Sequence, residues 1–259
     1  MKAKLIRFLS ISIAVLVLSG LCWGSYRFVS YLHTAQRFEV KALAISGFNG
    51  PLKRVTEDQV AGRAEFDVGT NVFKVDLDAI RERVEGLEWV RFAIVQRVLP
   101  DQIIVKVVER EPIGLSRIGG EVYQFDTDAT ILEMDPLSGA SFPILDGLRP
   151  REKEANLKKV AIYRKVLDEL GQTDLSEVHI NDTGEVSVVS ASEPMTVALG
   201  STDYRTRWIK YLQLKTQIQQ QFPKAVKIDL RFKDQVIVRM KEDESLGEQV
   251  VWRGDKRTL

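Results

Sequence analysis

Few side chains in this sequence have both the types and the spacing that catalysis or metal binding requires. Two carboxylate pairs, Asp76/Asp78 and Asp126/Asp128, are close enough in sequence to act as acid and base or to hold a cation. Both pairs stand where a helix or a turn is expected to begin, and aspartate is favoured there for capping alone. We therefore interpret both pairs as structural.

Other reactive residue types are scarce. The chain has two histidines, His33 and His179, and one cysteine, Cys22, so a site with several histidines, an intramolecular disulfide and a thiolate metal site are all excluded. It lacks a Gly-rich phosphate loop, a G-x-S-x-G elbow and an H-E-x-x-H helix. The sequence therefore predicts a protein that is not an enzyme, with no catalytic residues, no cofactor and no bound metal.

Composition places further limits on function. The 259 residues carry a formal net charge of +1, and 28% of them are charged. This is an ordinary globular surface without the basic excess of a nucleic-acid-binding protein. We expect no nucleic-acid partner and no small-molecule substrate.

The N-terminal segment has the character of a membrane span. The stretch from Phe8 to Trp23 has no charged residue, and basic residues precede it at Lys2, Lys4 and Arg7. A helix needs ~20 apolar residues to cross a hydrocarbon core. Basic residues tend to stay on the cytoplasmic side, so the N-terminus is expected in the cytoplasm and the rest of the chain outside.

We divide this segment into a cytoplasmic end (residues 1–7), a transmembrane helix (8–28) and a polar stalk (29–37). A cleaved signal peptide has a similar outline, but no A-x-A-like site follows the apolar run. A lipoprotein anchor at Cys22 is disfavoured by the bulky Leu21 before it. The preferred interpretation is a single uncleaved span.

A first folded domain is expected over residues 38–112. Apolar and polar residues alternate from Trp89 to Pro112 on both sides of a turn at Pro100-Asp101, which predicts a β-hairpin closed off by Pro112. Upstream, the spacing predicts a helix that opens at Asp76, a short helix after Thr56 and a strand from Val40 to Ser46. The expected order is strand, helix, helix, strand, strand.

A second domain is expected over residues 113–240, followed by a flexible tail over 241–259. Its predicted elements are a hairpin over 121–125 and 130–134, helices over 151–170 and 202–221, and strands over 178–180, 186–189, 195–199, 226–232 and 236–240. The tail is polar and irregular, although Val250-Val251-Trp252 could add a short contact.

Several short motifs in this order resemble the FtsQ/DivIB family of bacterial cell-division proteins. They are Ile45-Ser46-Gly47, Glu88-Trp89-Val90, the Arg-x-x-Pro of 97–100, Val105 to Pro112, and Asp229-Leu230-Arg231-Phe232. The resemblance implies an α+β chain with a single transmembrane helix. A POTRA domain of order β-α-α-β-β would follow it, and then a second domain of mainly antiparallel sheet with two helices.

The resemblance also implies a function. Family members are essential scaffolds of the inner membrane at the division septum, with their folded domains in the periplasm. They link early division proteins to FtsB and FtsL and to septal peptidoglycan synthesis. FtsA, FtsK, FtsW, FtsI and FtsN are further expected partners.

Candidate binding residues fall on two sheet borders. The last strand, as a free edge, could accept a strand from an FtsB-type partner; the residues expected there are Arg231, Phe232, Asp234, Val236, Val238, Arg239 and Met240. On the POTRA domain, Val95 and Arg97 of the second strand are expected to dock other components. The structural alternatives are a sheet edge protected by its charges, a packed Val95 and a solvated Arg97. Some relatives have Gly-Trp where an ungapped match places Arg239-Met240 of this chain. The affinity for the partner and the exact contact residues therefore do not carry over from those relatives at these two positions.

Two other functions fit parts of the sequence. A POTRA-containing transport or chaperone protein of the envelope would handle unfolded outer-membrane clients, but the chain has no repeated POTRA unit. A membrane-anchored cell-wall enzyme would turn over wall substrate.

Overall fold

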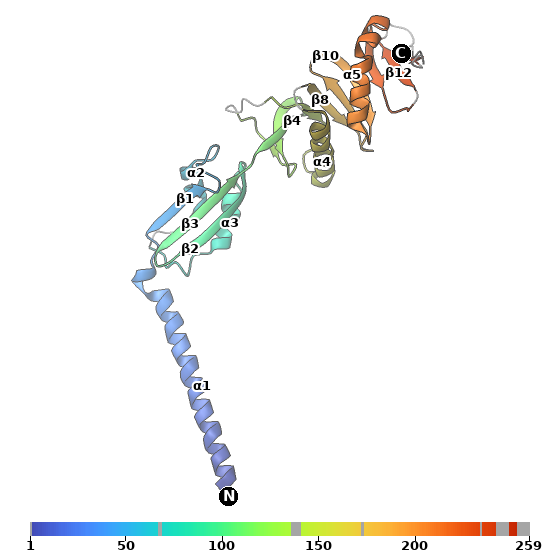
Figure 1. The fold of residues 1–259 in the computed structure, drawn as a ribbon. Coiled ribbons are helices and arrows are strands. Elements are labelled where there is room, and N and C mark those ends of the chain that lie inside the picture. The colour runs from blue at the N-terminus through green and yellow to red at the C-terminus, as the bar shows by residue number, and fades with distance from the viewer. Residues whose placement is uncertain are drawn as a thin grey trace. The chain divides into compact units, whose positions relative to one another are not determined.

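The computed structural model describes residues 2–66, 69–135, 141–171, 174–233, 235–241 and 249–252. The chain divides into two compact units, Met1–Arg110 and Glu111–Leu259 (Figure 1). This division lies two residues before the end of the domain expected over 38–112. Each unit is described by itself.

The first unit begins with the helix α1, Lys2–Thr34. By length and composition, Val15–Thr34 within it is apolar enough to cross a membrane, and none of that window is buried. The helix continues through most of the residues expected as a stalk. A short 3-10 turn, Gln36–Phe38, follows it.

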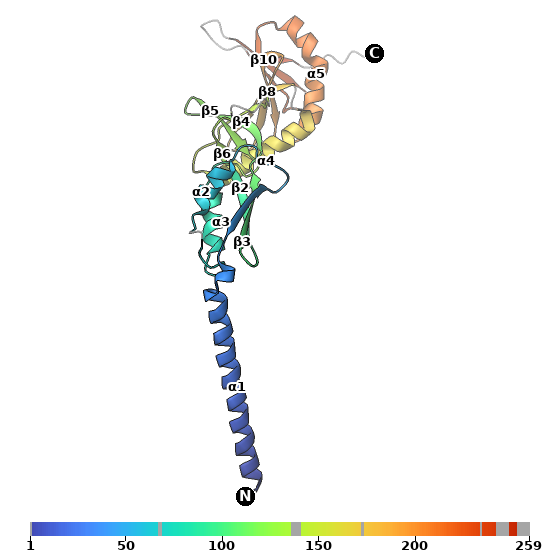
Figure 2. The same ribbon diagram turned by 90° about the vertical axis from the view of Figure 1, so that its left-hand side faces the viewer.

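The rest of the first unit is a small sheet with two helices. Its elements are β1 (Ala42–Gly47), α2 (Glu57–Ala64), α3 (Leu77–Glu85), β2 (Val90–Val98) and β3 (Gln102–Glu109). The strand order is β1-β3-β2, with β1 parallel and β2 antiparallel to the central β3. Both helices lie on one face of the sheet (Figure 2). The β-α-α-β-β order expected from the sequence is confirmed.

Local signals in the sequence explain where these helices start. The Thr56 hydroxyl accepts from the Gln59 amide while the Gln59 side chain accepts from the Thr56 amide, which completes a capping box. The Asp76 carboxylate accepts from the amides of Asp78 and Ala79 at the start of α3. The expected capping role of Asp76 is therefore confirmed, while the exposed Asp78 carboxylate pairs with Arg81 at 3.0 Å.

A single carboxylate holds the loop before α2 against the end of β3. Glu109 accepts hydrogen bonds from the backbone amides of Lys53 (3.0 Å), Arg54 (2.7 Å) and Val55 (2.8 Å). Hydrogen bonds to a charged acceptor are stronger than neutral ones. This side chain therefore fixes a loop that has no strand partner of its own within the described residues.

The second unit is built on one ten-stranded sheet. Its elements are β4 (Pro112–Ile118), β5 (Glu121–Asp126), β6 (Ile131–Leu132), β7 (Ile144–Asp146), α4 (Lys153–Leu170), β8 (Leu175–Ile180), β9 (Val186–Ser190), β10 (Glu193–Gly200), α5 (Tyr204–Gln221), β11 (Ala225–Asp229), β12 (Val236–Met240) and β13 (Gln249–Trp252). The order is β13-β12-β11-β10-β9-β8-β7-β4-β5-β6. Within the described residues, six neighbouring pairs are antiparallel and three are parallel. The expected α+β fold with a mainly antiparallel second domain is confirmed.

Helices α4 and α5 cover one face of this sheet (Figure 2). Alternate strand residues such as Val178, Val188 and Val197 are buried beneath them, together with Trp208 and Tyr211 of α5. The rings of Trp208 and Tyr211 lie 4.9 Å apart inside this core. The opposite face carries the half-buried, more polar residues of the same strands, as expected for a sheet covered on one side.

Three predicted boundaries are wrong. Pro112 does not close off the hairpin but begins β4, since a strand tolerates proline as its first residue. The strand expected over 226–232 ends at Asp229, and Arg231 and Phe232 lie in the connection to β12. The expected tail contains a strand, β13, although residues 242–248 and 253–259 lie outside the described residues.

Candidate functional site

The expected free edge on the last predicted strand is covered. β12 pairs with β11 on one side and with β13 on the other, in the register Val236↔Trp252 to Arg239↔Gln249. The expectation that β12 ends the sheet is therefore wrong. The apolar, β-branched run Val250-Val251-Trp252 favours a strand, and pairing satisfies the N–H and C=O groups that β12 would otherwise leave open.

The side chains of β12 alternate between the core and the open face. Val236 and Val238 are buried, so neither side chain is available to a partner. Arg239 is exposed and Met240 is half-buried. Asp234 lies outside the described residues. Of the candidate residues on β12, Arg239 and Met240 present side chains at the surface.

Arg231 is held in an ion-pair network. Its guanidinium lies 2.7 Å from the Asp229 carboxylate and 3.0 Å from the Glu185 carboxylate. Burial alone would raise the pKa of Asp229, but the hydrogen bonds and positive charge of Arg231 outweigh burial and lower this pKa. The same bonds raise the pKa of Arg231. Phe232, the next residue, is 41% exposed and is the large apolar side chain available beside this network.

On the first unit, β2 is a border strand of its sheet. Val95 is half-buried and packs against the core, while it pairs with Val105 of β3. The Arg97 guanidinium donates to the carbonyl oxygens of Val72 (2.9 Å) and Val75 (2.6 Å). The Arg97 guanidinium therefore holds β2 against the segment before α3. Its donor groups are engaged inside the unit, which neither of the two interpretations from the sequence included.

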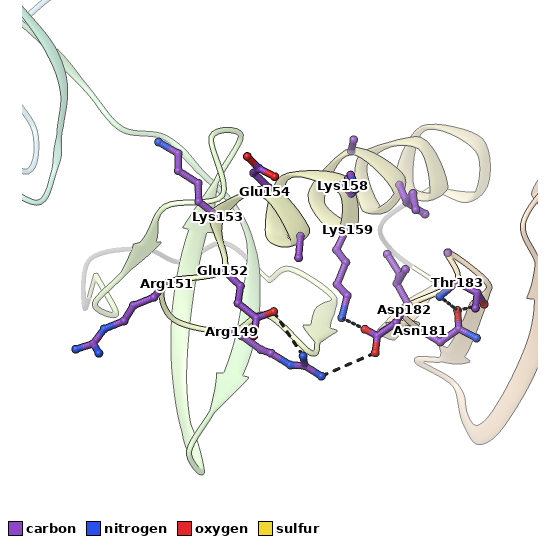
Figure 3. A pocket seen from close by; sticks show the side chains of 15 residues that line it. Arg149, Arg151, Glu152, Lys153, Glu154, Lys158, Lys159, Asn181, Asp182 and Thr183 are labelled. Atoms are coloured by element: carbon purple, nitrogen blue, oxygen red, sulfur yellow. Dashed lines mark hydrogen bonds and ion pairs between the residues drawn. The ribbon is translucent and has the colours of Figure 1, made fainter.

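A groove of about 1110 Å³ lies between the start of α4 and the turn after β8 (Figure 3). Lys159 and Arg149 converge there on Asp182, at 3.3 Å and 3.9 Å, while Arg151 and Lys153 point away. The Lys159 ammonium also donates to the Gly147 carbonyl oxygen at 3.0 Å. These charges are used to join two segments of the fold.

In the second carboxylate pair, Asp126 caps the β5–β6 turn. The Asp126 carboxylate accepts from the amides of Asp128 and Thr130, both at 2.9 Å. This is the turn capping that the sequence indicated.

One cluster was not predicted. His179 lies between Asp146 and Glu177 on the open face of the sheet. Glu177 and His179 are two residues apart in β8 and so share a face, but Asp146 joins them through the parallel pairing of β7 with β8. No local signal in the sequence indicates that pairing.

Comparison with known families decides the identity of the fold. Residues 38–110 match the family model described as "POTRA domain, FtsQ-type", and residues 115–231 match "Cell division protein FtsQ/DivIB, C-terminal". A cell division protein FtsQ of Koribacter versatilis is 30% identical over 254 residues, covering 91% of this chain and 70% of that protein. The chain belongs to the FtsQ/DivIB family. The strands β12 and β13 lie beyond residue 231, where the match to the C-terminal family model ends.

Other FtsQ relatives are more distant but similarly extended. The FtsQ protein of Syntrophotalea carbinolica is 23% identical over 206 residues, which cover 76% of this chain and 73% of that protein. That of Myxococcus fulvus is 26% identical over 211 residues, covering 76% and 71%. The chain is therefore a cell-division protein of the FtsQ/DivIB family, and its N-terminal helix fits a protein that spans a membrane once.

Proposed function

We propose that this FtsQ/DivIB chain is a non-enzymatic scaffold of the division complex. Its N-terminus lies in the cytoplasm, and its two folded units lie in the periplasm at the septum. It joins early division proteins to FtsB and FtsL, and through them to septal peptidoglycan synthesis. FtsA, FtsK, FtsW, FtsI and FtsN are further proposed members of the assembly.

One observation carries the proposal: the ten-stranded sheet ends on a short strand that the C-terminal region supplies. β13 covers β12 with four paired residues, and the match to the family's C-terminal model ends before both strands. A partner strand that makes the same antiparallel pairing would gain the same main-chain hydrogen bonds. We infer that an FtsB-type strand occupies the β13 position on β12, beside Arg239, Met240 and Phe232.

The anchor supports this mechanism physically. A membrane helix confines the folded units and similarly anchored partners to one surface, which raises their effective concentration. The second border, β2 of the POTRA unit, is proposed to contact other components through the surface around Val95. Arg97 would act there by holding the neighbouring loop.

Deletion of residues 242–259 tests the strand exchange. Because β13 then no longer competes for β12, the membrane-anchored chain without residues 242–259 should capture the periplasmic segment of FtsB more tightly than the complete chain does. Arg239→Glu in the deleted chain should weaken capture again, whereas the matched exposed change Arg151→Glu should not. Weaker capture by the deleted chain would contradict the exchange and assign docking to β13 itself.

Depletion of the chain from its host tests the function as a whole. Cells should grow as filaments that fail to complete septa, and the purified chain should release no product from peptidoglycan. Normal division after depletion would overturn the scaffold, and wall turnover by the purified chain would favour an anchored enzyme.

A further inference from the structure

Three side chains with metal-binding atoms meet on the open face of the ten-stranded sheet. The His179 ring places Nδ1 3.1 Å from the Asp146 carboxylate and Nε2 3.1 Å from the Glu177 carboxylate. One ligand atom from each residue lies within 4.8 Å of the other two. All three residues are half-buried and stand on paired strands, so their backbone positions are held by the sheet.

We propose that Asp146, Glu177 and His179 bind a zinc ion. One imidazole nitrogen and two carboxylate oxygens form the mixed N/O ligand set that zinc accepts, and water would complete a tetrahedral site. Magnesium and calcium favour six or more oxygen ligands and are poorly matched to a histidine. Because one ligand atom of each residue already lies within 4.8 Å of the other two, binding requires side-chain rotations on fixed strands and no change of the backbone.

Arg117 supplies a positive charge beside the same two carboxylates. Its guanidinium lies 3.9 Å from Asp146 and 3.7 Å from Glu177. The pairings of Leu115 with Ile144 and of Asp146 with His179 place Arg117, Asp146 and His179 in one row across β4, β7 and β8. Both distances exceed those of good hydrogen bonds, and the side chain is 46% exposed, so it can swing into solvent when zinc binds.

The site would fasten the short inner strand β7 to its neighbour β8. β7 has three residues and a single registered pair with β4, yet it connects the β4-β5-β6 end of the sheet to the other strands. An ion held by Asp146 and His179 would crosslink β7 to β8. Binding to the folded state alone would then stabilise the second unit.

Zinc titration of the full-length chain in detergent tests the proposal. The Cys22→Ser background removes the single thiol, and calorimetry gives the stoichiometry and affinity. We expect one zinc per chain and a rise in Tm of about 5–10 °C when free zinc is a hundredfold above Kd. Magnesium should bind at least tenfold more weakly.

Three variants separate this site from surface binding. His179→Gln should weaken zinc binding at least tenfold, while His33→Gln, the matched control, should not change it. Arg117→Gln removes a competing positive charge and should tighten binding by about threefold or more. The proposal is overturned if zinc fails to bind, if His179→Gln binds as tightly as the parent, or if Arg117→Gln weakens binding. The Arg117 result stands even if His179→Gln fails to fold.

Discussion

At the residue scale, two buried tyrosines differ in what their hydroxyl groups meet. The Tyr163 hydroxyl donates to the Pro143 carbonyl oxygen at 2.8 Å. The Tyr211 hydroxyl is buried without a hydrogen-bond partner in the described part of the chain. Burial raises the pKa of both, that of Tyr211 to about 12, so both stay neutral at physiological pH.

This contrast predicts opposite effects of the same substitution. Tyr211→Phe removes an unpaired buried polar atom and should leave the free energy of unfolding unchanged or raise it by up to about 1 kcal/mol. Tyr163→Phe breaks a hydrogen bond and leaves a carbonyl unpaired, so it should lower that free energy by about 1–2 kcal/mol. Chemical denaturation of the two variants measures both values. A larger loss for Tyr211→Phe than for Tyr163→Phe would show that the Tyr211 hydroxyl has a partner.

The network of Asp229, Arg231 and Glu185 predicts a pH dependence of stability. Folding lowers the pKa of Asp229 below its ordinary value of 3.8, so its contribution is complete above that value. The contribution is lost as the pH falls through the lowered pKa. Arg231→Met should therefore cost about 1–2 kcal/mol at neutral pH, a range that allows for the exposure of the arginine, and progressively less below pH ~4.

Denaturation of the parent and of Arg231→Met across this pH range is the measurement. Arg239→Met, an exposed arginine on the next strand, serves as the control and should show no such trend. A cost for Arg231→Met that stays constant under acid would assign the effect to packing of the arginine stem.

At the scale of elements, one carboxylate joins the end of β3 to the loop before α2. Glu109→Gln keeps the shape of this side chain but removes the charge that strengthens three hydrogen bonds to backbone amides. We expect a loss of about 1.5–3 kcal/mol in the unfolding free energy of the first unit. Faster hydrogen exchange at the Lys53, Arg54 and Val55 amides should accompany it. The exposed neighbour Glu111 provides the control, since Glu111→Gln should change neither quantity.

At the scale of the whole molecule, the proposed mechanism depends on the anchor and not on its detailed sequence. Replacement of residues 1–34 by an unrelated single-span helix of the same orientation should preserve division, because the effective concentration of partners at the membrane is retained. Fusion of the same folded units to a cleaved signal peptide should fail at the same expression level. Complementation of a depleted host measures both. Full complementation by the released form would contradict the role of the anchor.

The sequence alone determined the order of elements in the first unit and the two helices of the second, because helix periodicity, alternation along strands and caps such as Thr56 and Asp76 are local properties. It did not predict the strands β4 and β7, and it placed β13 in a tail. It also indicated the family, because several short motifs occur in the family's order. The sequence could not decide which strands are neighbours. The pairing of β13 with β12 joins residues 10 to 16 positions apart, and that of β7 with β8 joins residues 33 positions apart. Non-local contacts of this kind leave no periodic signal. For that reason the tertiary structure alone decided that the expected free edge is covered, that Arg97 holds a loop, and that His179 lies between Asp146 and Glu177.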